Sequence, residues 1–143
     1  MRKRLGARLG LFVLFAASGL AQTNAGRTIQ VEINYTGSGT VNASHLIYVA
    51  LWDSSDFNSG PPAAVKSLDS KKGTVTFSDV QRDRAYITTA YDPTGSWGAQ
   101  SPPPPGCSLG MYSKNPPKAD PIDVVPGKPV KVSITFDDSV KVP

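Results

Sequence analysis

The sequence contains only one cysteine, Cys107, and only one histidine, His45, among its 143 residues. A single cysteine excludes an intramolecular disulfide, so the hydrophobic core alone has to stabilise the fold. One histidine and one cysteine also leave too few nitrogen and sulfur ligands for a typical zinc site. Catalysis of the Ser-His-Asp or Cys-His kind would depend on His45, and neither Ser44 nor Cys107 lies in a recognisable nucleophile motif. The sequence therefore predicts a protein that is not an enzyme, the alternative being a small hydrolase that pairs His45 with a carboxylate.

Beyond its first eight residues, the chain has no excess of positive or negative charge. It has 15 Lys and Arg against 11 Asp and Glu, a formal charge of +4. Four of the cations precede the apolar stretch 9–21, and the other 11 balance the acids. A basic total would favour nucleic acid as a partner, but this one depends on the N-terminus, so no nucleic-acid partner is expected. The four N-terminal cations are Arg2, Lys3, Arg4 and Arg8.

No apolar run is long enough to cross a bilayer, which needs roughly 20 residues. The stretch 9–21 is shorter, and a cationic segment precedes it, as in a secretory signal peptide. Small residues place the cleavage site after Ala21 or after Ala25. We therefore expect residues 1–25 to be a signal peptide and the mature protein to be secreted or periplasmic, without membrane insertion.

The mature sequence is rich in alternating apolar and polar residues, the pattern of half-buried strands. A second kind of segment, residues 45–52, is apolar at every position after the first, which predicts a central strand covered on both faces, with Trp52 in the core. Weaker segments, of which the first is expected at a sheet edge, are 63–68 and 120–125. The segments with alternation are 28–35, 73–78, 84–91 and 130–136.

Seven strands without a helix predict an all-β fold, an antiparallel β-sandwich in a single domain from residue 26 to residue 143. The proline-rich segment 92–120 is predicted to be one long loop, and loops of that length are often functional. Tyr86 follows a polar corner at residues 79–83. It is therefore expected to fold over the core as the tyrosine corner of Greek-key sandwiches does.

Three runs, residues 47–54, 73–80 and 85–95, resemble the transthyretin-like or carboxypeptidase-regulatory-like sandwich domains, and most closely small exported bacterial proteins of unknown function. The resemblance extends over about residues 28–137 and implies a Greek-key, immunoglobulin-like (prealbumin-like) sandwich. These domains usually have a glycine before the corner tyrosine, whereas this chain has Arg84 two residues before Tyr86. The resemblance implies an accessory, adhesive or binding module and not an enzyme.

Three functions are consistent with the sequence. The first is an exported binding or accessory module, with the 92–120 loop as its contact surface and another exported protein or a polysaccharide as its partner. The second is a carbohydrate-binding module, since flat rings flanked by amide and hydroxyl groups suit a sugar face. The third is a structural spacer of the cell envelope. The aromatic residues expected to bind a sugar are Tyr91, Trp97 and Tyr112.

Aspartates at strand ends give a further candidate site. If seven strands alternate in direction, five aspartates lie at one pole of the sandwich, where their oxygens suit calcium. The alternative is that each aspartate ends its strand by accepting hydrogen bonds from the local backbone. No other cofactor is expected. The five residues are Asp69, Asp92, Asp120, Asp137 and Asp138.

Overall fold

The computed structural model describes residues 25–143, which form eight strands and no helix. The predicted signal peptide lies outside the described residues, apart from Ala25. Within residues 25–143 there is no helix long and apolar enough to span a bilayer. The strands are β1 (Ile29–Tyr35), β2 (Ile47–Trp52), β3 (Ala64–Leu68), β4 (Lys72–Phe77), β5 (Arg84–Tyr91), β6 (Ser108–Met111), β7 (Ile122–Asp123) and β8 (Val130–Phe136).

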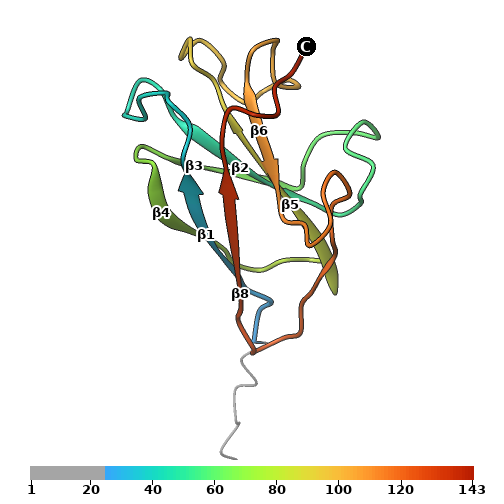
Figure 1. Ribbon diagram of the computed structural model, residues 1–143. Helices are drawn as coiled ribbons and strands as arrows, with labels where there is room; N and C mark the ends of the chain where they lie inside the picture. Colours follow the sequence, from blue (N-terminus) through green and yellow to red (C-terminus); the bar gives the residue numbers. More distant parts are fainter. Residues whose placement is uncertain (1–24) are drawn as a thin grey trace, which may run out of the picture.

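The strands form two sheets (Figure 1). The three-stranded sheet has the order β4-β1-β8, and the five-stranded sheet has the order β3-β2-β5-β6, with β7 also paired to β5. The predicted all-β class is confirmed. The prediction that every strand pair is antiparallel is wrong for β1 and β8, which run parallel. These strands come from opposite ends of the domain and are not joined by a tight turn, so no hairpin forces them to be antiparallel.

One hydrophobic core lies between the sheets and takes alternate residues from each. On β1, Ile29, Val31, Ile33 and Tyr35 are at most 2% exposed, while the residues between them are polar. Burying one such side chain contributes roughly 1.5–3 kcal/mol to folding. The period-two pattern of the sequence therefore fixes which face of each strand is buried. The residues that complete this core from β2, β5 and β8 include Ile47, Val49, Leu51, Ala85, Ile87, Tyr91, Val132, Ile134 and Phe136.

The predicted 92–120 loop is wrong in one respect, because it contains strand β6. Ser108 of β6 lies opposite Tyr91 of β5. On the other side of β6 runs the C-terminal segment, where the Leu109 N–H donates to the Val140 carbonyl at 2.9 Å. The prolines at 102–105 and 116–117 stand on either side of β6 and do not interrupt it. The strand can therefore keep its hydrogen bonds in a proline-rich segment.

Two predicted burial patterns are also wrong. Residues 45–52 are not covered on both faces, because the inward residues of β2 alternate with partly exposed ones. Trp52 is one of the partly exposed residues and lies on the outer face of the sheet, not in the core. Tyr86 makes no tyrosine corner, since Ala85 and Ile87 on either side of it fill the inward positions of β5. Tyr86 therefore lies on the same outer face as Trp52.

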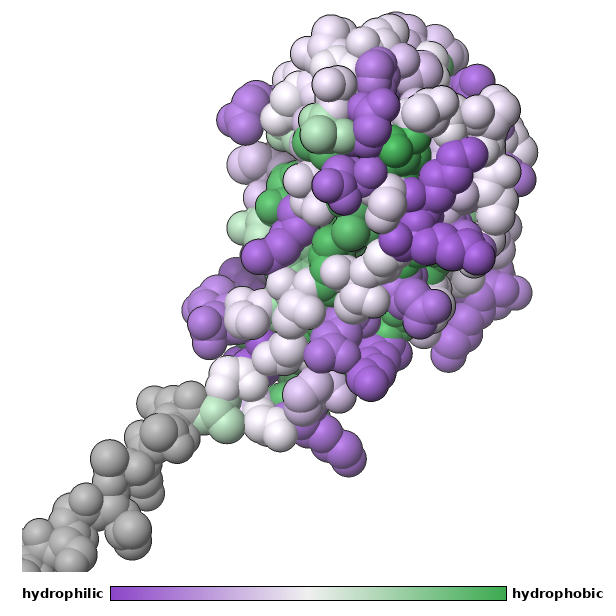
Figure 2. Space-filling model, turned by 90° about the vertical axis from the view of Figure 1, so that its left-hand side faces the viewer, coloured by the Kyte–Doolittle hydropathy of each residue, from purple (hydrophilic) through white to green (hydrophobic). Residues whose placement is uncertain are grey.

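Strand β3 lies at a sheet edge, as predicted. Its Lys66 occupies an inward register position, opposite the buried Val49, but the lysine side chain is exposed. The side of the molecule that carries the β4 edge shows mostly hydrophilic residues, with hydrophobic ones between them (Figure 2). The side of the molecule at the β4 edge is therefore mostly polar, whereas the β3 edge also exposes Val65.

Candidate functional site

The outer face of the five-stranded sheet carries aromatic and apolar side chains, and all of the aromatic ones are only partly buried. The register places Trp52 of β2 opposite Tyr86 of β5, and Met111 of β6 opposite Thr88 of β5. Residues directly opposite one another share a face, so these side chains form one continuous surface. We call this surface, together with two rings from the flanking loops, the aromatic face. Its members are Tyr48, Ala50, Trp52, Phe57, Tyr86, Thr88, Ala90, Trp97, Leu109 and Met111.

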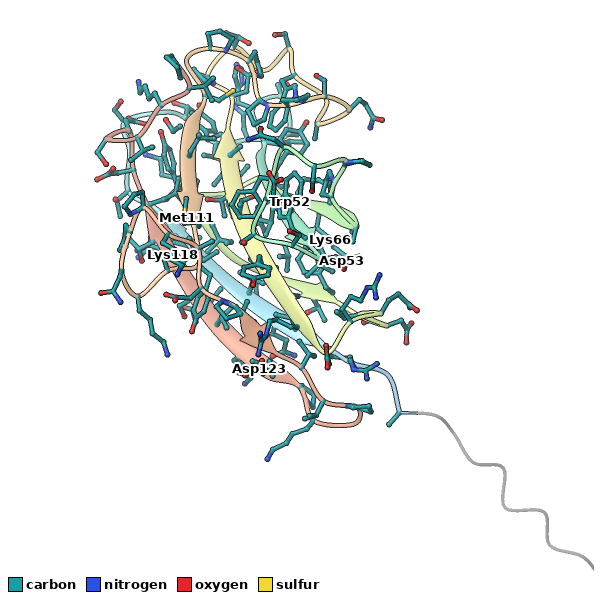
Figure 3. All side chains as sticks on the ribbon, turned by 90° about the vertical axis from the view of Figure 1, so that its right-hand side faces the viewer. Trp52, Asp53, Lys66, Met111, Lys118 and Asp123 are labelled. Carbon is teal, nitrogen blue, oxygen red and sulfur yellow. The ribbon has the colours of Figure 1, made fainter. Side chains whose placement is uncertain are left out.

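No member of the aromatic face is charged, and the charged groups nearby lie at its rim. Arg84 Nε is 3.2 Å from Asp123 Oδ1, and Arg82 Nε is 3.8 Å from Asp53 Oδ2. Exposed ion pairs of this kind add little stability, but each arginine has a carboxylate beside it that offsets its charge. In Figure 3, Trp52 and Met111 lie on either side of β5, and Asp123 lies near one end of that strand. An uncharged centre inside a polar rim is the usual anatomy of a contact surface.

Trp52 is fixed at one end of the aromatic face. Its indole Nε1 donates to Thr88 Oγ1 at 2.9 Å, across the β2–β5 pair. The ring of Phe57, from the loop after β2, lies 5.1 Å from the Trp52 ring at an angle of 56°. The tilted contact is a favourable arrangement of two rings. Trp52 and Phe57 therefore form the first ring pair of the face.

Trp97 reaches the other end of the face from the loop after β5. Its ring lies edge-on to Tyr48, 5.0 Å away. The Tyr48 hydroxyl donates to the Trp97 carbonyl at 3.0 Å, and the indole Nε1 of Trp97 donates to the Ser101 carbonyl at 3.0 Å. Trp97 is thus held through its backbone and through its ring, and with Tyr48 it forms the second ring pair.

Asp92 organises the loop that presents Trp97. It is 3% exposed, and its carboxylate accepts hydrogen bonds from the backbone N–H groups of Thr94 and Trp97, each at 2.8 Å, and from the Thr94 hydroxyl. Burial raises the pKa of Asp92, but these hydrogen bonds outweigh it and the pKa is lowered overall. The carboxylate is therefore charged at neutral pH and is used within its own loop.

Of the three aromatic residues predicted to bind a sugar, only Trp97 lies on this face. Tyr91 is 2% exposed, its ring is 4.9 Å from that of Tyr35, and its hydroxyl donates to the Thr40 carbonyl. Tyr112 packs against the core, and its N–H donates to the Ile87 carbonyl. Tyr91 occupies an inward position of β5, and Tyr112, the residue after β6, continues the inward alternation of that strand. The predicted set does not form one surface, because two of its rings belong to the interior.

Four of the five predicted aspartates, all but Asp120, follow strands that end at the same pole, but they do not form a metal site. Asp120 does not lie at the pole with Asp92, since its N–H donates to the Tyr112 carbonyl, beside the middle of β5. Strand β6 was not among the seven predicted strands. It adds one reversal of the chain between Asp92 and Asp120, and this reversal moves Asp120 away from the pole. Within residues 25–143, no three His, Cys, Asp or Glu side chains are placed to hold a metal ion.

The other aspartates hold local structure. Asp69 is exposed in the turn between β3 and β4, and Asp137 accepts the Ser139 N–H at 2.8 Å. Asp138 accepts hydrogen bonds from the hydroxyls of Tyr35 and Ser108, at 2.5 and 2.6 Å, and these keep its pKa below the usual range. The oxygens of Asp138 and Asp92 are thus engaged within the fold.

The single histidine and the single cysteine also have structural surroundings. His45 Nδ1 is 3.2 Å from Asn42 Oδ1, which also accepts the His45 N–H in a tight turn before β2. Cys107 is fully buried, and burial, with the nearby charge of Asp92, raises the pKa of its thiol to about 11. A thiol with a raised pKa and no exposure is a poor nucleophile.

The outer face of the three-stranded sheet differs in composition. Its outward residues are polar or charged, among them Glu32 on β1, Lys72 on β4 and Ser133 on β8. Two shallow grooves of about 360 and 160 Å³ lie there, lined mainly by such residues. The two outer faces of the sandwich therefore present different chemistry, and only one of them is aromatic.

Four rings of the aromatic face, Tyr48, Trp52, Phe57 and Tyr86, were not among the predicted site residues. Three of them could have been found from the alternation along the strands. Tyr48, Trp52 and Tyr86 occupy the outward positions of β2 and β5, next to inward apolar residues. Comparison with protein-family models, with curated proteins and with solved structures found no match for this chain.

Proposed function

We propose that this protein is an exported, non-enzymatic binding module and that the aromatic face is its contact surface. One observation carries the proposal: the two outer faces of the sandwich differ, and one of them gathers both tryptophans of the chain in an uncharged, partly exposed surface. Aromatic side chains that gather at a protein surface are a common feature of interaction sites. The segment 92–120 contributes Trp97 to the contact surface, and the sheet contributes the rest.

The non-enzymatic part of the proposal is supported by the surroundings of the usual catalytic residues. His45 belongs to a turn with Asn42, and Cys107 is buried with a raised pKa. The export part is supported by the cationic segment and apolar run at the start of the sequence. On this proposal the protein acts in the periplasm or outside the cell, where it attaches itself or a partner to a target.

We also propose that the fold is a Greek-key, immunoglobulin-like sandwich of transthyretin-like type. Two unequal sheets with a parallel pairing of the first and last strands support this arrangement. The sequence runs that resemble the transthyretin-like domains fall mostly on β2, β4 and β5. They correspond to core strands and turns, so they bear on the fold and not on the ligand.

The test is co-sedimentation of the purified mature protein with washed cells and extracellular matrix of the producing organism. We expect the unmodified protein to pellet with this material and the double variant Trp52→Ala, Trp97→Ala to stay in the supernatant. The matched control is Thr74→Ala with Ser133→Ala on the outer face of the three-stranded sheet, which is expected to pellet normally. Thermal melting of each variant verifies that it is folded.

Two results would overturn the proposal. One is that the unmodified protein stays in the supernatant. The other is that the folded double variant pellets as well as the unmodified protein, since the aromatic face would then not be the contact surface.

A further inference from the structure

The aromatic face has two ring pairs, one near each end of strand β2. Tyr48, which contacts Trp97, and Trp52, which contacts Phe57, are four residues apart on β2. Four residues of extended strand span about 13 Å. This separation exceeds a single sugar ring or amino-acid side chain, so a ligand that touches both pairs has to be larger than either, and an extended chain meets this requirement.

The two indole N–H groups are not available to such a ligand, which can contact only the rings themselves. Nε1 of Trp52 donates to Thr88, and Nε1 of Trp97 donates to the Ser101 carbonyl. Both polar ends are therefore already satisfied within the protein. Because the rings are also fixed by these bonds, binding costs little side-chain entropy.

The hydroxyls of the face come from Tyr48, Tyr86 and Thr88, and that of Tyr48 already donates to the Trp97 carbonyl. Thr88 Oγ1 accepts the Trp52 N–H, so its own hydrogen is available to donate. No member of the face is charged, and the nearest arginines face aspartates at the rim. Charge complementarity thus favours a ligand that is itself uncharged. A chain with apolar C–H faces and neutral hydroxyls fits this surface.

We propose that the aromatic face binds an uncharged polysaccharide, which stacks on the Tyr48–Trp97 and Trp52–Phe57 ring pairs and bonds to the hydroxyls of Tyr86 and Thr88. This inference rests on the proposed function, since it names the ligand class of the same surface. Protein contact surfaces commonly place arginine among their aromatic anchors, and this face has none. A protein partner and a second copy of the chain are therefore outcomes of the test.

Chemical treatment of the target material separates the two classes of ligand. Periodate cleaves the vicinal diols of sugars, and protease digests proteins. Retention of binding after protease and its loss after periodate support the proposal. Binding that is lost after protease overturns the polysaccharide and leaves the binding module intact. Failure to pellet untreated material is instead the failure of the proposed function.

Tryptophan fluorescence gives the direct measurement, because both tryptophans of the chain lie on the face. We expect at least one of four oligosaccharide series, cello-, chito-, malto- and xylo-oligosaccharides, to change the emission, with affinity rising with chain length. Trp97→Ala and Trp52→Ala are each expected to weaken binding about two- to tenfold, the size of a ring contact. Thr74→Ala on the other sheet is the control. No response to any series, or binding that falls steeply with added salt, overturns the proposal.

Discussion

The Tyr35 hydroxyl donates a 2.5 Å hydrogen bond to Asp138, which lies 103 residues later in the chain. The same carboxylate accepts from the Ser108 hydroxyl at 2.6 Å and from the Ser38 N–H at 2.9 Å. Tyr35 ends β1, Ser108 begins β6, and Asp138 follows β8, so one side chain connects the two sheets at this pole. Its contacts have consequences for stability on both sides of neutral pH.

Replacing Asp138 by asparagine should lower stability at neutral pH by about 1.5–3 kcal/mol, the value of hydrogen bonds to a charged group. The hydrogen bonds from Ser108, Tyr35 and Ser38 lower the pKa of Asp138 in the folded state. The unfolded state therefore binds more protons in acid, and stability falls as the pH drops below about 4. Urea unfolding from neutral to acid pH should show a shallower decline in Asp138→Asn. An unchanged acid decline would mean that Asp138 is not a main source of it.

Tyr35 contributes to the loss of stability on the alkaline side. Burial, with the hydrogen bond to Asp138, raises the pKa of Tyr35 from its ordinary value of 10.0 to about 12. The folded state therefore holds its proton longer, and stability is lost as the pH rises from about 10 to 12. Tyr35→Phe should reduce this alkaline loss in the same urea measurement. Tyr48→Phe is the matched control. Its hydroxyl bonds to the Trp97 carbonyl instead of a carboxylate, and the variant should keep the alkaline loss.

Asp92→Ala should release Trp97 from its fixed position. The Trp97 N–H loses its acceptor, at a cost of about 1–3 kcal/mol for an unpaired buried donor. In a Trp52→Phe background, where Trp97 is the single tryptophan, acrylamide should quench the tryptophan emission more strongly than in the parent. Asp56→Ala is the control, because Asp56 caps an exposed loop turn at Asn58. Equal quenching in Asp92→Ala and the parent would contradict the role of Asp92.

Cys107 should resist thiol reagents in the folded protein, because it is fully buried and its pKa is raised to about 11. The C-terminal segment contributes to this protection, since the Val142 N–H donates to the Cys107 carbonyl at 3.0 Å. Removing residues 140–143 should increase the rate of labelling, measured by mass spectrometry after timed exposure. Val140→Ala keeps the backbone hydrogen bonds and is expected to label as slowly as the parent. Equal rates in the truncated and full chains would show that the segment protects nothing.

Periodicity predicted the fold well where burial follows the strand period. The segments 84–91 and 130–136 match β5 and β8, because each has one face in the core and one outside. Strand β6 could not be predicted in this way. It has four residues, lies between two proline clusters, and is held by pairing with Tyr91 and with the C-terminal segment. Such long-range pairing leaves no local pattern.

The candidate site was only partly predictable for a related reason. An apolar run such as 45–52 predicts two buried faces, because sequence alone does not distinguish an aromatic residue facing a second layer from one facing solvent. Trp52 and Tyr48 belong to the second kind. Trp97 was predicted as a site residue because polar residues surround it in the loop. Its position beside Tyr48 depends on the hydrogen bonds of Asp92, which the sequence does not show.

Lys66 bears on how the protein behaves in a crowded compartment. A free edge strand offers unpaired backbone groups to any other strand, and an inward-pointing charge is one way to prevent such pairing. Lys66 occupies an inward position of the β3 edge, so a second chain that added there would have to bury its ammonium group. The same residue that weakens the alternation of this strand in the sequence thus protects the protein from polymerising through its edge.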